Sequence, residues 1–153
     1  MNPDFLIGCN GRCAQASSIE HPVSLDEASI DEQFRLVKET GVFDYFDRIP
    51  LRASSDEYKS AVEKYKLPIH TASWFYRLGD EDDEKLISDN LKIASEIGAD
   101  MHNMMIFTHH ARGHVVTDQE LIDCYLKCYD EGMKLGVEPT FELHVNMWSE
   151  DFR

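Results

Sequence analysis

The stretch IGADMHNMMIFTHH, residues 97–110, contains the joint that decides the fold. A helical pattern ends at Gly98, and a few residues later the chain enters a run that is apolar at residues 104–107. Glycine commonly ends a helix because it adopts the left-handed conformation without steric cost. The same joint recurs at Gly41-Val42 and at Gly136-Val137. Repetition of this joint predicts a chain built from β/α units.

The remaining sequence fits this alternation. Capping boxes at Ser54-x-x-Glu57 and Thr117-x-x-Glu120 predict two helix starts, and the acidic stretch GDEDDEK (79–85) suits a third. An earlier helix is predicted within residues 25–40. Alternating strands and helices predict an α/β fold with a parallel sheet covered by helices, in one domain spanning residues 1–153. The predicted strands are residues 4–9, 42–49, 67–74, 100–110 and 138–147.

Composition narrows the range of partners. The 153 residues carry a net charge of -14, which disfavours nucleic acid and anionic lipid. No apolar run is long enough for a membrane span and the N-terminus does not resemble a signal peptide, so we expect a cytoplasmic location. In that reducing compartment, the pairs Cys9-x3-Cys13 and Cys124-x3-Cys128 are expected to be structural thiols.

Polar side chains are expected to meet at the carboxyl ends of the strands, where folds of this class place their sites. Glu142 and His144 are two residues apart in a predicted strand, so they share a face. His70 and His109 lie on the preceding predicted strands, and with Glu142 they could converge on one metal ion. A single histidine at a strand end is more often a structural, hydrogen-bonded residue, but the set together with Glu142 points to a site. Which of His109 and His110 faces the site stays open.

An aromatic side chain near this predicted site has two interpretations. Trp74 follows His70 closely and could form an apolar wall for a sugar ring, although ordinary packing also explains it. The sequence contains no GxGxxG, GxxxxGK[ST], GxSxG or HExxH motif, so dinucleotide, P-loop, nucleophile-elbow and zincin chemistry are not indicated in their usual forms.

Three segments of the chain resemble the xylose isomerase-like TIM barrels. They are LPIHTASWFYRLGDED (67–82), IGADMHNMMIFTHHARG (97–113) and GVEPTFELHVNMWSEDF (136–152). That superfamily comprises sugar phosphate isomerases and epimerases together with endonuclease IV-type phosphoesterases. The chain departs from many relatives in having HHARG where they have His-Pro-Gly, and Leu143 where they have asparagine.

The resemblance covers essentially the whole chain and implies an incomplete (β/α)8 barrel. A complete barrel has about 250 residues, whereas this chain reads as four βα units and a fifth strand. It would therefore be the N-terminal part of a barrel and catalytically inactive alone. Its open sheet edges lead us to expect a homo-oligomer.

The resemblance also implies a function in carbohydrate metabolism. The whole protein would be a metal-dependent isomerase or epimerase that moves a proton next to the carbonyl of a sugar or sugar phosphate. The implied cofactor is a divalent metal (Mn, Mg, Zn or Co), with Glu142, His109 and His70 as candidate ligands. Glu142 would also transfer the proton, while His70, Trp74 and His144 would contact the substrate.

Two alternatives remain open from the sequence. One is a zinc-dependent phosphoesterase of the endonuclease IV type, with His70, His109 and Glu142 as zinc ligands; the net charge argues against DNA as its substrate. The other is a non-enzymatic, five-stranded doubly wound domain, flavodoxin-like, that binds a small ligand or a partner.

Overall fold

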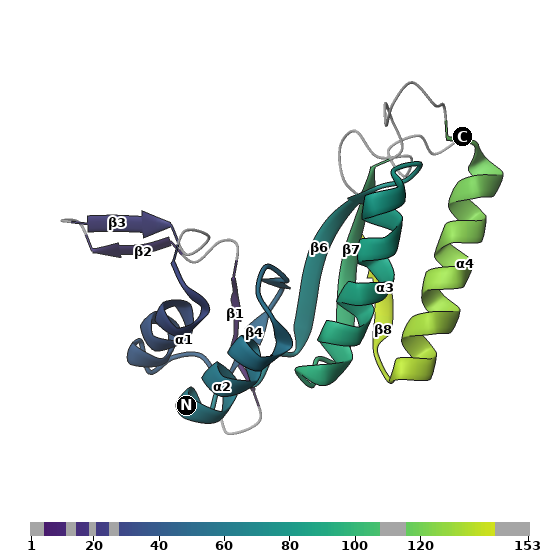
Figure 1. The fold of residues 1–153 in the computed structure, drawn as a ribbon. Helices are drawn as coiled ribbons and strands as arrows, with labels where there is room; N and C mark the ends of the chain where they lie inside the picture. The colour runs from purple at the N-terminus through teal and green to yellow at the C-terminus, as the bar shows by residue number, and fades with distance from the viewer. Residues whose placement is uncertain (1–4, 12–14, 19–20, 25–27, 108–115, 143–153) are drawn as a thin grey trace.

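The computed structural model describes residues 5–11, 15–18, 21–24, 28–107 and 116–142 (Figure 1). Short strands alternate with four helices after an N-terminal hairpin. The elements are β1 (Gly8–Asn10), β2 (Gln15–Ser18), β3 (His21–Ser24), α1 (Ile30–Glu39), β4 (Tyr45–Asp47), β5 (Ile49–Pro50), α2 (Ser55–Tyr65), β6 (Thr71–Arg77), α3 (Glu81–Glu96), β7 (Met101–Phe107), α4 (Asp118–Leu135) and β8 (Glu138–Phe141).

The strands that alternate with helices are parallel and lie in chain order. β1 pairs with β4, and β5, β6, β7 and β8 form a second parallel sheet in that order. A bridge between Phe46 in β4 and Ile69 just before β6 connects the two sheets. A flavodoxin-like sheet has the order 2-1-3-4-5 instead. The predicted parallel β/α fold is therefore confirmed, and its strand order is that of a partial TIM barrel. The doubly wound alternative is wrong, because it requires a different strand order.

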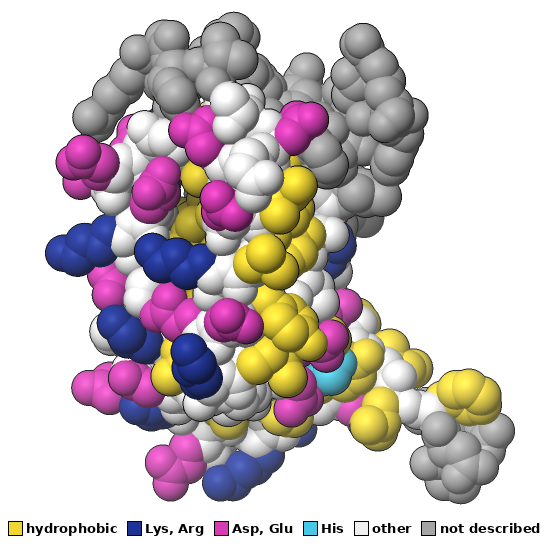
Figure 2. All heavy atoms as spheres, turned by 90° about the vertical axis from the view of Figure 1, so that its right-hand side faces the viewer, with side chains coloured by type: hydrophobic (Ala, Val, Ile, Leu, Met, Phe, Trp, Pro, Cys, Tyr) yellow, Lys and Arg dark blue, Asp and Glu magenta, His cyan; other side chains and the backbone are white. Residues whose placement is uncertain are grey.

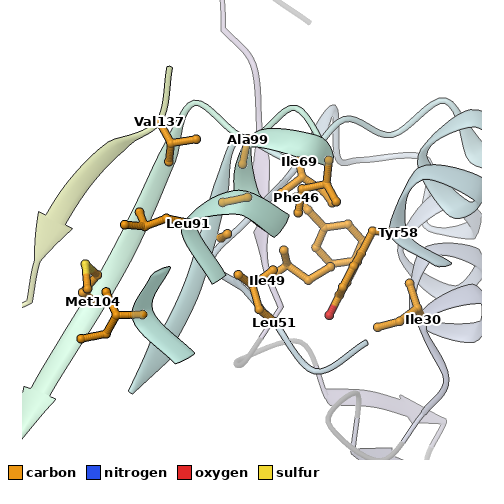
Figure 3. Close-up of a cluster of buried hydrophobic side chains, with 14 of the residues drawn as sticks. Ile30, Phe46, Ile49, Leu51, Tyr58, Ile69, Leu91, Ala99, Met104 and Val137 are labelled. Carbon is orange, nitrogen blue, oxygen red and sulfur yellow. The ribbon is translucent and has the colours of Figure 1, made fainter. Parts of the chain in front are cut away.

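The helices also follow chain order. α1 contacts α2, α2 contacts α3, and α3 contacts α4. Between this helical layer and the strands lies one hydrophobic core, which includes Phe46, Tyr58, Leu91 and Met104 (Figure 3). The opposite face of the sheet, away from these helices, is called the inner face below.

The predicted helix ends are confirmed where sequence signals were strongest. Ser54 and Thr117 each form a capping box, and the Asp80 side chain caps α3. Gly136 ends α4 with a φ of 76°, in the left-handed region. α2 ends differently, because Lys66 takes the left-handed conformation with a φ of 52° and no glycine is present.

Several element boundaries differ from the prediction. β2 and β3 form an antiparallel hairpin that the sequence did not indicate. The third predicted strand, residues 67–74, begins instead at Thr71 and continues to Arg77. The second predicted strand is interrupted at Arg48, which has a φ of 53°. The shift of β6 matters most, because it moves His70 from the strand to the position before it.

Both strands at this interruption carry core residues three positions apart. Phe46 and Ile49 are fully buried in the core, and so are their partners Ile69 and Ala72. In a regular strand, residues three apart point to opposite faces. The irregular backbone between the members of each pair allows both to face the helices.

The outer surface of α4 carries an exposed apolar row. We define the α4 stripe as Ile122, Leu126, Tyr129 and Met133, which are 44–61% exposed. Their spacing of four, three and four residues places them along one side of the helix. Figure 2 shows hydrophobic side chains gathered in a band on this side of the molecule.

Candidate functional site

The direction of side chains along β6, β7 and β8 defines what lies on the inner face. Tyr76 and His102 point to the helices, since Tyr76 accepts a hydrogen bond from Asn90 of α3 and lies beside His102. Alternation therefore places Ser73 and Asn103 on the inner face. On β8, Phe141 stacks on Tyr125 of α4, which places the side chains of Thr140 and Glu142 on the inner face.

Glu142 is the centre of the polar groups on this face. Its carboxylate oxygens Oε1 and Oε2 each lie 3.3 Å from a terminal nitrogen of Arg48. Asn103 Nδ2 donates a hydrogen bond of 2.8 Å to Oε2. The Glu142 side chain is 21% exposed, so it is sheltered while one side stays open to solvent. A cation and an amide together fix the orientation of this carboxylate.

Further polar groups extend this cluster along the inner face. The Ser73 hydroxyl donates to the backbone carbonyl of Arg48 at 3.3 Å, and the Thr140 hydroxyl donates to Asn103 Oδ1 at 3.4 Å. The buried Thr71 hydroxyl has no hydrogen-bond partner within the described ranges. Thr71 and Ser73 are buried, so of these three hydroxyls only that of Thr140 belongs to a partly exposed residue.

The structure does not bring His70 to Glu142. His70 Nδ1 lies 2.7 Å from Asp100 Oδ2, before β7 begins, whereas the Glu142 backbone N–H donates to the carbonyl of Met104. Four strand residues from Asp100 to Met104 correspond to about 13 Å. The predicted convergence of these two side chains is therefore corrected: His70 lies at the amino end of β6 because the strand starts at Thr71.

The other predicted site residues have different outcomes. Trp74 shares a strand face with Ala72 and Tyr76 and packs partly buried against the hydrophobic core, and its ring stacks on that of Phe75 at a centroid distance of 5.2 Å. This placement agrees with ordinary packing, and a contact of Trp74 with a sugar ring stays a prediction. His109, His110 and His144 lie outside the described residues.

Asn103 was not identified from the sequence, and Arg48 was predicted only as a polar residue at the end of the second strand, with no specific role. Asn103 is a buried amide next to His102 in a strand whose other residues are apolar, and a polar residue in such a run was the available signal. Arg48 is one of two non-glycine residues with positive φ among the described residues. No sequence pattern marks that conformation.

A second polar cluster lies on the helical side of the sheet. Tyr76 Oη is 2.6 Å from His102 Nε2 and accepts a hydrogen bond from Asn90 Nδ2 at 3.0 Å. Burial lowers the pKa of His102 to about 4 and raises that of Tyr76 above its usual range. Both groups are neutral at pH 7, so this cluster is a polar part of the core.

The described residues do not fit a metal ion by themselves. Glu142 is already paired with Arg48, a cation that competes with a metal for the carboxylate. Among the residues that the structure describes, no three His, Cys, Asp or Glu side chains form a group able to hold a metal. Also within this part of the chain, no helix combines the length and the apolar composition of a membrane span.

Comparison with known proteins identifies the fold but no family. No family profile matches the sequence, and no curated protein matches it. Among solved structures, the chain is similar to D-allulose 3-epimerase from Methylomonas sp. in complex with D-allulose, with a TM-score of 0.66 and 12% identity. It is also similar to IolI protein with a bound zinc atom (TM-score 0.56, 13% identity) and to type I 3-dehydroquinate dehydratase from Clostridium difficile (TM-score 0.54, 16% identity).

Each match covers most of this chain but only about half of the other protein. They cover 94% of this chain for the epimerase and IolI and 90% for the dehydratase, but only 52–54% of each of those proteins. The chain thus spans about half the length of the structures it matches. At such low identity the similarity supports the fold, since one barrel fold hosts many chemistries.

Proposed function

We propose that this chain contributes Glu142 to an isomerase or epimerase that moves a proton next to the carbonyl of a sugar or sugar phosphate. The observation that carries the proposal is the contact of Glu142 with Arg48 and Asn103 on the inner face. One similar structure, a D-allulose 3-epimerase in complex with D-allulose, supports the same general kind of function.

The proposed chemistry uses a carboxylate beside a permanent cation. Glu142 would accept the proton from the carbon next to the carbonyl and return it to the product. Arg48 would stabilise the carboxylate and the negative charge that develops on the substrate oxygen. Asn103 would fix the orientation of the carboxylate, and Thr140 would offer a hydroxyl to the substrate.

A divalent metal is a separate part of the proposal. Because the described residues do not form a metal site, the steps above use only side chains of this chain. His109 and His144 stay predicted as metal and substrate ligands, while His70 is left out because of its distance from Glu142. Metal analysis of the purified protein, before and after chelation, tests this part independently.

We also propose that the 153 residues form the N-terminal part of a barrel. The chain-order sheet and its coverage of about half of each similar structure support this extent. The isolated chain would then lack part of the site and be inactive. In that arrangement the full-length protein would be the form that binds sugar.

The test measures exchange of a substrate C–H proton with D2O by NMR, using a panel of ketoses and ketose phosphates. The natural full-length protein containing these residues should exchange the proton next to the carbonyl. Glu142→Gln should lower the rate by about 100-fold or more, as expected for loss of a general base. The control is Glu138→Gln, which changes an exposed glutamate at the start of the same strand.

The outcomes separate the parts of the proposal. Unchanged exchange in Glu142→Gln would refute the role of Glu142. Exchange by the 153-residue chain alone would refute its inactivity. No specific observation favours the phosphoesterase alternative, since it needs His70 and Glu142 at one zinc site.

A further inference from the structure

Two cysteines on α4 lie close together at the boundary with α3. Cys124 and Cys128 are one helical turn apart, and their sulfur atoms are separated by 3.9 Å. Cys124 is partly exposed and Cys128 is buried. Both are free thiols. Their contact lowers the pKa of Cys124, because the neighbouring thiol can donate a hydrogen bond to its thiolate.

Both thiols line a cavity of about 360 Å³ between α3 and α4. Its wall includes the apolar side chains of Leu78 and Ile87 and one cation, Lys127. Its acidic wall residues are Glu84, Glu120, Asp123 and Glu131. This excess of carboxylates disfavours an anionic ligand and favours a neutral or cationic one.

The helix geometry favours a bridging atom over a disulfide. Cβ atoms at i and i+4 of a helix are about 5–6 Å apart. A disulfide needs Cβ atoms about 3.5–4.5 Å apart, so closing one here would distort α4. An atom bonded to both sulfurs lengthens the link and removes that conflict. The pair should therefore stay reduced and available as a chelate.

We propose that Cys124 and Cys128 form a dithiol site for a thiophilic metal ion or metalloid that is satisfied by two sulfur ligands. Within the described ranges no third metal-binding side chain completes a cluster with them. This favours a soft species such as trivalent arsenic over a four-coordinate ion. The site lies on the helical side of the sheet and is independent of the proposed function on the inner face.

Reaction with phenylarsine oxide illustrates the chemistry. Two S–As bonds form, and the bond between arsenic and oxygen breaks. The oxygen leaves as water with the two thiol protons, and no atom changes its oxidation state. The product is a neutral ring that includes both sulfurs.

The experiment titrates the folded chain with phenylarsine oxide and follows intact mass and free thiols. We expect one equivalent to bind Cys124 and Cys128 with loss of both free thiols. Cys124→Ser and Cys128→Ser should each weaken binding by about 100-fold or more, because the second sulfur supplies a high effective concentration. The matched control replaces Cys9 and Cys13, the other Cys-x3-Cys pair, with serine and should still bind one equivalent.

A second measurement needs no substitution. Trypsin cuts after Lys127, between the two cysteines, so the arsenic ring should hold the two resulting peptides together in the mass spectrum. Two separate, unmodified peptides from the treated folded protein would overturn the proposal. So would binding that is unchanged in the variant lacking both Cys124 and Cys128.

Discussion

Arg48 and Glu142 are 94 residues apart in the sequence, yet the guanidinium of one lies 3.3 Å from both carboxylate oxygens of the other. The contact joins the residue between β4 and β5 to the residue that follows β8. Paired terminal nitrogens and carboxylate oxygens form the fork that gives arginine its geometric specificity. The left-handed backbone of Arg48 is part of this arrangement.

Variants of Arg48 should separate its backbone strain from its ion pair. Arg48→Ala loses the pair and keeps a side chain in the left-handed region, whereas Arg48→Gly loses the pair and relieves that strain. We expect the glycine variant to be more stable than the alanine variant by about 1 kcal/mol. In a chain of this size the difference corresponds to about 2–4 °C in Tm, measurable by circular dichroism. Equal Tm values would contradict strain at this position.

Stability should fall with acid because of His102. Its folded-state pKa of about 4 lies below the ordinary value, so between about pH 6.5 and pH 4 the unfolded chain binds a proton that the folded chain does not. Unfolding is then favoured as the pH falls. By linkage, this group lowers the free energy of unfolding by about 2 kcal/mol when the pH falls from 7 to 5.

Urea unfolding at pH 7 and pH 5 measures this contribution. The variant His102→Gln retains a polar group near Tyr76 but cannot titrate. Between pH 7 and pH 5 its free energy of unfolding should therefore fall by about 2 kcal/mol less than that of the wild type. His70→Gln is the control, since the His70 side chain is partly exposed and lies just before β6 at the amino end of that strand. An identical pH dependence in wild type and His102→Gln would show that the burial of His102 has no such effect.

Gly132→Ala should be destabilising, although alanine normally favours a helix by about 0.5–1 kcal/mol over glycine. An added Cβ would lie 2.7 Å from the Val137 carbonyl oxygen and 2.8 Å from Pro139 Cδ. Overpacking of this kind costs about 1–3 kcal/mol, so it outweighs the gain in propensity. Chemical denaturation of Gly132→Ala and of the double variant with Pro139→Ala tests the explanation. The double variant should recover part of the loss, and a stabilised single variant would contradict the predicted close contact.

The α4 stripe should promote self-association of the 153-residue chain, in line with the expected homo-oligomer. Its spacing is the one that helices use to pack against each other. Leu126→Lys should therefore lower the apparent mass in light scattering and leave the secondary structure unchanged. Lys134→Ala, outside the stripe, is the control. A monomeric wild-type chain would contradict this prediction.

The alternation of strands and helices could be predicted because local signals mark it. Capping residues at Ser54 and Thr117 and the glycine at 136 act within a few residues of the elements they delimit. The β2–β3 hairpin was missed, because no glycine-containing turn or alternating run marks it in the sequence. The start of β6 was misplaced because Ile69 is as apolar as a strand residue but only bridges β4.

The candidate site could be predicted only in part. Glu142 was identified because a carboxylate in an apolar strand needs a partner, and the structure supplies Arg48 and Asn103. The partners themselves depend on strand order and on the backbone of Arg48, neither of which is encoded locally. His70 was misplaced by the same shift that moved the start of β6.

The matched spacing of Phe46 with Ile49 and of Ile69 with Ala72 has an evolutionary consequence. Removing one residue between Phe46 and Ile49 alone would shift the register between the two strands, so that Ile49 would no longer lie opposite Ala72 while Phe46 lies opposite Ile69. A compensating deletion between Ile69 and Ala72 would restore the match. Length changes at these two places should therefore be inherited together or not at all.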